Sequence, residues 1–259
     1  MKNTVLTLIA MALVGLGNAA IANAESAPSD PIETALASPD RPEADRTQDE
    51  RRKAREFLEF AGIEPGMRVL DAFAASGYYT ELLSRIVGPE GEVIAYNNPA
   101  YARFAAKGIE ARYAGNRLPN VQQVTEEVDQ LALPPRSLDA AIFVMSFHDM
   151  YWRPADGSWA RTDPMQMLRK LHAAMKVGGV VIVQDHVAAP GGDTAEVVDK
   201  LHRIDPEVVR RDFKAAGFAL ETESPMFAHP DDDHAKGVFD PAIRGRTDQF
   251  LFKFRRPGP

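Results

Sequence analysis

The chain of 259 residues contains no cysteine. Disulfides, thiolate metal sites, lipid attachment through an N-terminal cysteine and a cysteine nucleophile are therefore all excluded. The chain also lacks an excess of basic residues, since 30 Lys and Arg stand against 37 Asp and Glu. Nucleic acids and anionic membranes are bound through basic surfaces, so the formal charge of -7 argues against both as partners.

The apolar run that suggests a targeting segment lies at the N-terminus. Lys2 precedes a mostly apolar stretch over 5–17, and Ala22-Asn23-Ala24 has the small-x-small pattern of a cleavage site. The stretch is shorter than the ~20 apolar residues that a membrane-spanning helix needs. We predict that 1–24 is a signal peptide cleaved after Ala24 and that the protein is exported to the periplasm without stable membrane insertion. A retained membrane anchor is the alternative.

The rest of the chain divides into a short polar segment and one large domain. Residues 25–46 are rich in Pro, Ala, Ser and acids without hydrophobic periodicity, which predicts a flexible linker. Over 47–259 helical patterns alternate with short apolar runs, which is typical of βαβ units and a largely parallel sheet. The strands are predicted at Arg68–Ala72, Glu92–Tyr96, Val121–Val124, Ala140–Val144, Val180–Gln184, Phe218–Glu223 and Gln249–Phe254.

The stretch from Met67 to Thr80 carries the strongest functional signal. An apolar run ends in the acid Asp71, passes through small residues to Gly77 and enters a helical pattern over 78–87. A strand that turns into a helix beneath small side chains lets a ligand approach the backbone and meet the positive end of the helix. The pattern therefore predicts a site for a nucleotide-like cofactor.

The spacing Asp71-x-Phe73-x-Ala75-x-Gly77 resembles motif I of class I S-adenosylmethionine (SAM) methyltransferases. It follows the Asp-x-Phe-x-Gly-x-Gly variant, with Ala75 in place of one glycine. From about Thr47 to Arg256 the chain is most similar to a bacterial group of exported predicted methyltransferases. The sequence marks of that group are present at Gly77–Glu81, His148–Trp152 and Asp240–Phe250.

This resemblance implies a fold, a cofactor and an activity. The fold is α/β, with a Rossmann-like, seven-stranded, mostly parallel sheet, helices on both faces and a C-terminal antiparallel hairpin. The last two predicted strands, which no helical pattern separates, would form that hairpin. The cofactor is SAM, and its methyl group would pass to a small or medium-sized acceptor molecule. The residues that would bind SAM are Asp71, Phe73, Ala75, Gly77, Tyr78, Asn97 and Glu127.

Three of these positions allow a second interpretation. The ring of Tyr78 could face the sulfonium of SAM, or it could pack the first helical turn against the sheet. Asn97 stands where the family usually keeps an acid for the ribose, and its side-chain carbonyl can accept a hydrogen bond; it could instead be a turn residue. Glu127 falls where the family keeps an acid near the adenine, or it belongs to a solvated pair with Glu126.

Candidate groups for chemistry follow the fourth and fifth predicted strands. His148-Asp149 and Asp185-His186 stand at these strand ends, which the expected sheet order makes neighbours. We predict His148 as a general base with Asp149 beside it; a structural pair that fixes the loop is the alternative. The four side chains have the ligand types of a divalent metal site. Their spacing is not a recognised ligand pattern, so no metal site is predicted.

Two alternative functions and the role of one loop remain to be decided. An exported protein that binds a ligand on the same scaffold without turnover is the main alternative to an enzyme. A nucleotide-dependent oxidoreductase is disfavoured, because Gly-x-Gly-x-x-Gly is absent after the first strand. The loop from Tyr151 to Trp159 holds both tryptophans of the chain. It could cover a substrate or simply pack against the neighbouring helices.

Overall fold

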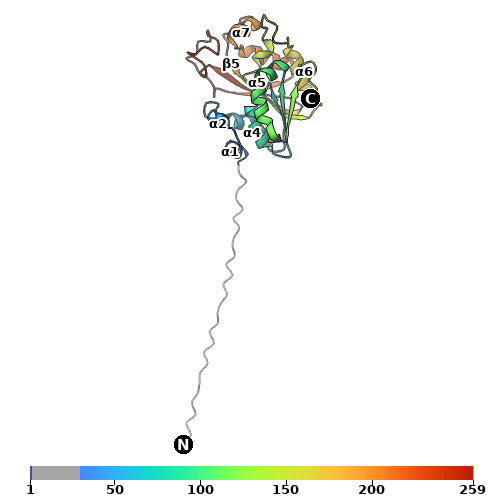
Figure 1. Ribbon diagram of the computed structural model, residues 1–259. Helices are drawn as coiled ribbons and strands as arrows, with labels where there is room; N and C mark the ends of the chain where they lie inside the picture. The colour runs from blue at the N-terminus through green and yellow to red at the C-terminus, as the bar shows by residue number, and fades with distance from the viewer. Residues whose placement is uncertain (2–29, 259) are drawn as a thin grey trace.

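The sheet that organises the molecule has seven strands in the spatial order β3-β2-β1-β4-β5-β7-β6 (Figure 1). The computed structural model describes Met1 and residues 30–258, so the predicted leader over 1–24 lies outside the described residues. Strands β1 to β5 pair in parallel, and β7 pairs antiparallel with both β5 and β6. The predicted fold, including its C-terminal hairpin, is confirmed. The strands are β1 (Arg68–Ala72), β2 (Glu92–Asn97), β3 (Val121–Thr125), β4 (Leu138–Val144), β5 (Met175–His186), β6 (Ala219–Ser224) and β7 (Gln249–Arg255).

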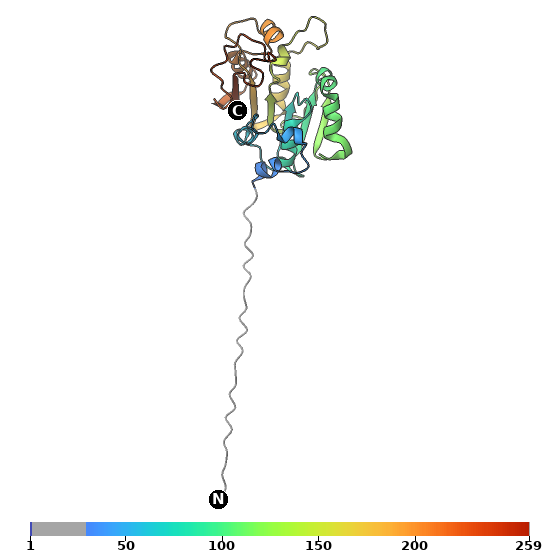
Figure 2. The same cartoon turned by 60° about the vertical axis from the view of Figure 1, so that its left-hand side comes forward.

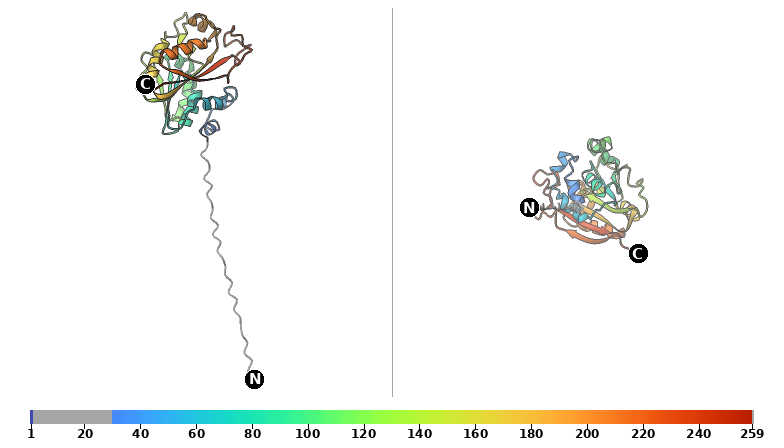
Figure 3. Two further views of the ribbon diagram at one scale, coloured as in Figure 1. Left: turned by 180° about the vertical axis from the view of Figure 1, so that it is seen from behind. Right: turned by 90° about the horizontal axis from the view of Figure 1, so that it is seen from below.

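Helices cover both faces of this sheet. Because successive strand side chains point to opposite faces, Val69 packs into one layer of the core and Leu70 into the other. Helices α1, α3 and α4 pack on the Val69 face, whereas α6 and α8 pack on the Leu70 face. Figure 3 shows α8 and the C-terminal strands from behind. The helices are α1 (Pro31–Leu36), α2 (Glu43–Arg46), α3 (Ala54–Ala61), α4 (Tyr78–Val87), α5 (Pro99–Tyr113), α6 (Pro164–Ala174), α7 (Thr194–Leu201) and α8 (Pro206–Ala215).

Helix α5 lies at the margin of the molecule (Figure 2). Of its 15 residues only Ala105 and Arg112 are buried. Its start is nevertheless well defined, because Asn98 caps the backbone N–H of Tyr101 and Pro99 occupies the first turn. This cap fixes the first turn of α5 directly above the carboxyl edge of β2.

The prediction of a flexible linker over 25–46 is wrong for its described part. Helices α1 and α2 fold within it, and Ala35 belongs to the core beside α4. Arg41 is buried and donates to both oxygens of Asp49, each at 2.7 Å. The composition of the segment did not predict this order, because the residues that hold the segment in place come from elsewhere in the chain. Among the described helices, none has the length and apolar character needed to cross a membrane.

Candidate functional site

The turn between β1 and α4 has an unusual backbone. Phe73, Ala75 and Gly77 all adopt positive φ angles, of 56°, 50° and 81°. A Cβ at Gly77 would lie 2.8 Å from Oη of Tyr113, so both conformation and space demand glycine there. Ala75 holds a left-handed conformation without being glycine, which costs on the order of 1 kcal/mol. The alanine that departs from the family pattern is thus accommodated as backbone strain.

The side chain of Asn97 stabilises this turn. Its Oδ1 accepts from the N–H of Ala75 at 2.8 Å, and its Nδ2 donates to the carbonyl of Ala75 at 3.1 Å. Both ends of the amide are therefore engaged by the backbone N–H and C=O of one residue. The carbonyl oxygen of Asn97 has a second lone pair, so its role toward a ribose stays a prediction. The sequence showed the strand end but not which backbone the amide would bind.

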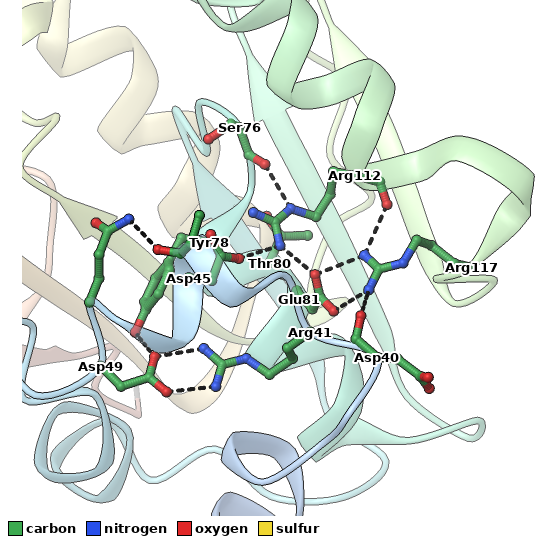
Figure 4. A network of polar contacts seen from close by, with 12 residues as sticks. Asp40, Arg41, Asp45, Asp49, Ser76, Tyr78, Thr80, Glu81, Arg112 and Arg117 are labelled. Carbon is green, nitrogen blue, oxygen red and sulfur yellow. Dashed lines mark hydrogen bonds and ion pairs between the residues drawn. The ribbon is translucent and has the colours of Figure 1, made fainter.

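A buried ion cluster supports the turn from its other side (Figure 4). Arg112 of α5 donates from Nε to the carbonyl of Ser76 at 2.9 Å and pairs with Asp45 of α2 at 2.5 Å. Arg112 and Arg117 both pair with Glu81 of α4. Burial raises the pKa of Glu81. Hydrogen bonds from Arg117, Arg85 and Arg112 outweigh burial and lower that pKa to about 2. The cluster ties α2 and α5 to the start of α4.

A cavity of about 200 Å³ lies against the turn, and we call it the motif I cavity. Phe73 and Ala75 line it and do not fill it. A second cavity of about 500 Å³ shares Ala75 with the first and continues along α5. The residues that line the motif I cavity are Arg52, Asp71, Phe73, Ala74, Ala75, Ser76, Tyr78, Tyr79, Tyr101, Val144 and Met145.

Side chains of opposite charge, Asp71 and Arg52, line the motif I cavity. Asp71 is buried and accepts from Oγ1 of Thr80 at 2.6 Å, and burial raises the pKa of Asp71 to about 6. The guanidinium of Arg52 lies 4.4 Å from the ring centroid of Tyr78. Tyr78 also donates its hydroxyl to Asp49 at 2.6 Å. The cation beside the Tyr78 ring is here a side chain of the protein, and the contact of this ring with a sulfonium stays a prediction.

Glu127 lies at the same edge of the sheet but outside the motif I cavity. It follows β3 and is half-buried, and its backbone carbonyl accepts from the N–H groups of Gln130 and Leu131. The hydroxyl of Tyr96 donates to the neighbouring carbonyl of Glu126 at 3.0 Å. Nothing in this arrangement directs the Glu127 carboxylate toward the motif I turn, so its role near an adenine stays a prediction.

A chain of hydrogen bonds and one ion pair joins the ends of β4 and β5. His148 opens the short 3-10 helix η2 (His148–Tyr151), and its Nδ1 lies 2.7 Å from Oδ1 of Asp185. Its Nε2 lies 3.3 Å from Oδ1 of Asp149. The other oxygen of Asp149 accepts from the hydroxyl of Tyr101. The chain thus runs from Asp185 through His148 and Asp149 to Tyr101.

The charges in this chain bear on the predicted role of His148. Burial lowers the pKa of His148, but Asp149 and Asp185 outweigh burial and raise it to about 9. An imidazolium donates and cannot accept a proton, so this environment favours a neighbouring carboxylate as base, and the role of His148 as general base stays a prediction. His186 is separate, since burial lowers its pKa to about 4 and its Nδ1 lies 2.8 Å from Oγ1 of Thr247. Within residues 30–258, no group of three or more His, Asp or Glu is arranged to hold a metal ion.

A third cavity lies beside Asp149, and we call it the aromatic cavity. Its volume is about 460 Å³, and Tyr101 lines both this cavity and the motif I cavity. Arg52 could not be selected from the sequence, and the one local signal for Tyr101 was the Asn98 cap that places it. The residues that line the aromatic cavity are Ala100, Tyr101, Arg103, Phe104, Asp149, Trp152, Ser158, Trp159, His202 and Phe239.

Comparison with known proteins agrees with this geometry. Residues 45–112 match the family described as protein-L-isoaspartate(D-aspartate) O-methyltransferase. The ubiquinone/menaquinone biosynthesis C-methyltransferase UbiE of Pasteurella multocida is 28% identical over 127 residues, which are 49% of this chain and 42% of that protein. UbiE of Shewanella sp. strain W3-18-1 is 24% identical over 70% of this chain and 68% of its own length. The chain thus spans less than half of the Pasteurella relative.

Solved structures show the same fold at low sequence identity. A SAM dependent methyltransferase from Aquifex aeolicus superposes with a TM-score of 0.55 at 19% identity, covering 88% of this chain and all of that one. An arsenic(III) SAM methyltransferase from Chlamydomonas reinhardtii gives 0.51 at 19% identity over 90% of this chain and 75% of that one. The sheet order and the solved structures show that the chain has the fold of class I SAM-dependent methyltransferases. The family match over 45–112 and the UbiE relatives are likewise methyltransferases to which this chain is similar.

Proposed function

We propose that the protein transfers the methyl group of SAM to a small or medium-sized acceptor bound in the aromatic cavity. The observation that carries this proposal is the position of Tyr101, which lines the cofactor side and the acceptor side at once. Its hydroxyl donates to Asp149, a carboxylate that also lines the aromatic cavity. Cofactor, acceptor and proton acceptor would therefore meet at one point on the carboxyl edge of the sheet.

The motif I cavity has groups that suit the amino-acid end of SAM. That end carries an ammonium and a carboxylate, which complement Asp71 and Arg52 respectively. The cavity alone is smaller than the ~300–1,000 Å³ of typical ligand pockets. The adjoining cavity beyond Ala75 offers the further volume that an adenosyl group needs. When bound, SAM supplies an electrophilic methyl carbon.

The protein's own contribution is alignment and removal of a proton. Holding two reactants in line can supply effective molarities of ~10⁵–10⁸ M. A positioned base contributes about 10²–10⁴-fold when the accepting atom carries a proton. Asp149 is the carboxylate of the chain Asp185–His148–Asp149 that lines the acceptor cavity. His148, held between the two acids, fixes the orientation of Asp149 and is a positioning residue.

Calorimetric titration with SAM and S-adenosylhomocysteine tests the cofactor part of this proposal. The wild-type chain is expected to bind both ligands. Arg52→Gln should weaken binding about 10- to 100-fold, because a charge-assisted hydrogen bond is worth about 1.5–3 kcal/mol. Arg51→Gln is the matched control, since Arg51 is the exposed neighbour and does not line the cavity. Absence of binding to the wild type would remove the proposal, and equal loss in both variants would remove the role of Arg52.

A further inference from the structure

Both tryptophans of the chain line the aromatic cavity. The ring centroids of Trp152 and Trp159 are 5.1 Å apart, and Trp159 lies 5.1 Å from Tyr101. His202 continues the wall, at 5.3 Å from Trp152 and 5.1 Å from Phe239. Five rings therefore form a connected surface. Such walls favour flat, aromatic ligands, because ring pairs at these separations contribute about 0.5–1.5 kcal/mol beyond burial of area.

One buried polar group in this wall bears on which ligand the cavity binds. Asp149 lines the cavity and is a buried carboxylate, which accepts hydrogen bonds and donates none. The cavity therefore offers a hydrogen-bond acceptor within a wall of aromatic rings.

A hydroxyl group on an aromatic ring suits this arrangement. Its O–H can donate to the carboxylate of Asp149 while the ring that carries it packs against the aromatic wall.

Exposed apolar side chains stand at the rim of the same cavity. Phe104 of α5 is 88% exposed and Phe239, in the connection between β6 and β7, is 63% exposed. They are two of the five large hydrophobic residues that are exposed in the described part of the chain. Exposed aromatic side chains beside a concave site are typical of ligand-binding surfaces. A ligand that carries an apolar substituent would cover them.

We propose that the aromatic cavity binds an aromatic molecule with a ring hydroxyl and an apolar substituent, and that this is the class of the methyl acceptor. The hydroxyl contacts Asp149, the ring packs against Trp152 and Trp159, and the substituent lies against Phe239. The binding site stands on the structure alone. Its identity as the acceptor site rests on the proposed function.

Intrinsic tryptophan fluorescence tests this proposal without SAM, because both fluorophores line the cavity. Catechol, with its hydroxyls free, should change the fluorescence in a saturable way. Veratrole, its dimethyl ether, and cyclohexanol, which lacks the aromatic ring, should bind at least about tenfold more weakly. Asp149→Asn should weaken catechol binding about 10- to 100-fold. Equal responses to the three compounds, or no saturable response, would overturn the proposal.

Two further variants test the same site if Asp149→Asn does not fold. Phe239→Ser changes an exposed residue and should weaken binding of 4-tert-butylcatechol about threefold to tenfold more than it weakens binding of catechol. Val177→Ser is the matched control, since Val177 is 55% exposed and does not line the cavity. Loss of 4-tert-butylcatechol affinity in both variants, or in neither, would contradict the assigned site. Catechol binding without SAM binding would leave the site standing and remove only the methyltransferase proposal.

Discussion

The titration of Asp71 links a single residue to cofactor binding. Its pKa is raised to about 6 by burial, so the group is largely protonated in the free protein below that pH. An ammonium ligand binds the carboxylate form more tightly. We therefore expect the affinity for SAM to rise as pH increases through 6, measured by calorimetry across this range. Asp71→Asn should bind more weakly with no such rise, and a rise of equal size in that variant would exclude Asp71 as its cause.

His148 makes an opposite contribution to the pH dependence of stability. Its pKa is raised from 6.5 to about 9 in the folded protein, so the folded state binds its proton more tightly than the unfolded state does. The stabilisation is complete below pH 6.5 and is lost as pH rises through 9. Urea unfolding should show a free energy of unfolding that falls over this window. His148→Gln should flatten the fall, whereas an unchanged slope would show that His148 is not protonated.

Some residues of the site could be predicted from the sequence and others could not. Gly77 was evident, because a strand-to-helix turn needs a residue that tolerates positive φ. The joining of His148 with Asp185 followed from two adjacent strand ends. The protonation of His148 could not be predicted, since it depends on two carboxylates that the fold brings within hydrogen-bonding distance. The hydrogen bonds between Asn97 and Ala75 likewise could not be predicted, because the two residues are 22 positions apart in the sequence.

At the scale of elements, the strands were predictable and the N-terminal helices were not. The alternation of apolar runs and helical patterns is local information, and each predicted strand overlaps one in the structure. Helices α1 and α2 have 6 and 4 residues, too few to be stable in isolation. They are ordered by contacts with α4 and α5, which no local pattern encodes.

The ion cluster that ties these elements together leads to a prediction. Glu81 is fully buried and pairs with Arg112 and Arg117, so Glu81→Ala would leave Arg117 without its carboxylate partner and the buried Arg112 with Asp45 alone. Breaking such a pair costs about 3–5 kcal/mol. Urea unfolding should show a loss of this size. Glu59→Ala, which removes the exposed partner of Arg55, is the control and should cost less than about 1 kcal/mol. Similar losses in the two variants would contradict the importance of the cluster.

At the scale of the whole molecule, the described domain begins after the predicted leader. We propose that residues 1–24 direct export and are removed after Ala24. Expression in a Gram-negative host should yield a periplasmic protein whose N-terminal sequence begins at Glu25. Full-length protein found in the cytoplasm or held in the membrane would contradict this proposal.

The arrangement of the whole molecule places cofactor and acceptor on one edge of the sheet, separated by Tyr101. A crystal structure of the protein with S-adenosylhomocysteine tests this arrangement most directly. We predict density in the motif I cavity, with the amino-acid end between Asp71 and Arg52 and the sulfur on the side of Tyr101 that faces Asp149. Density elsewhere in the molecule, or a motif I cavity that stays empty at saturating ligand, would contradict the account.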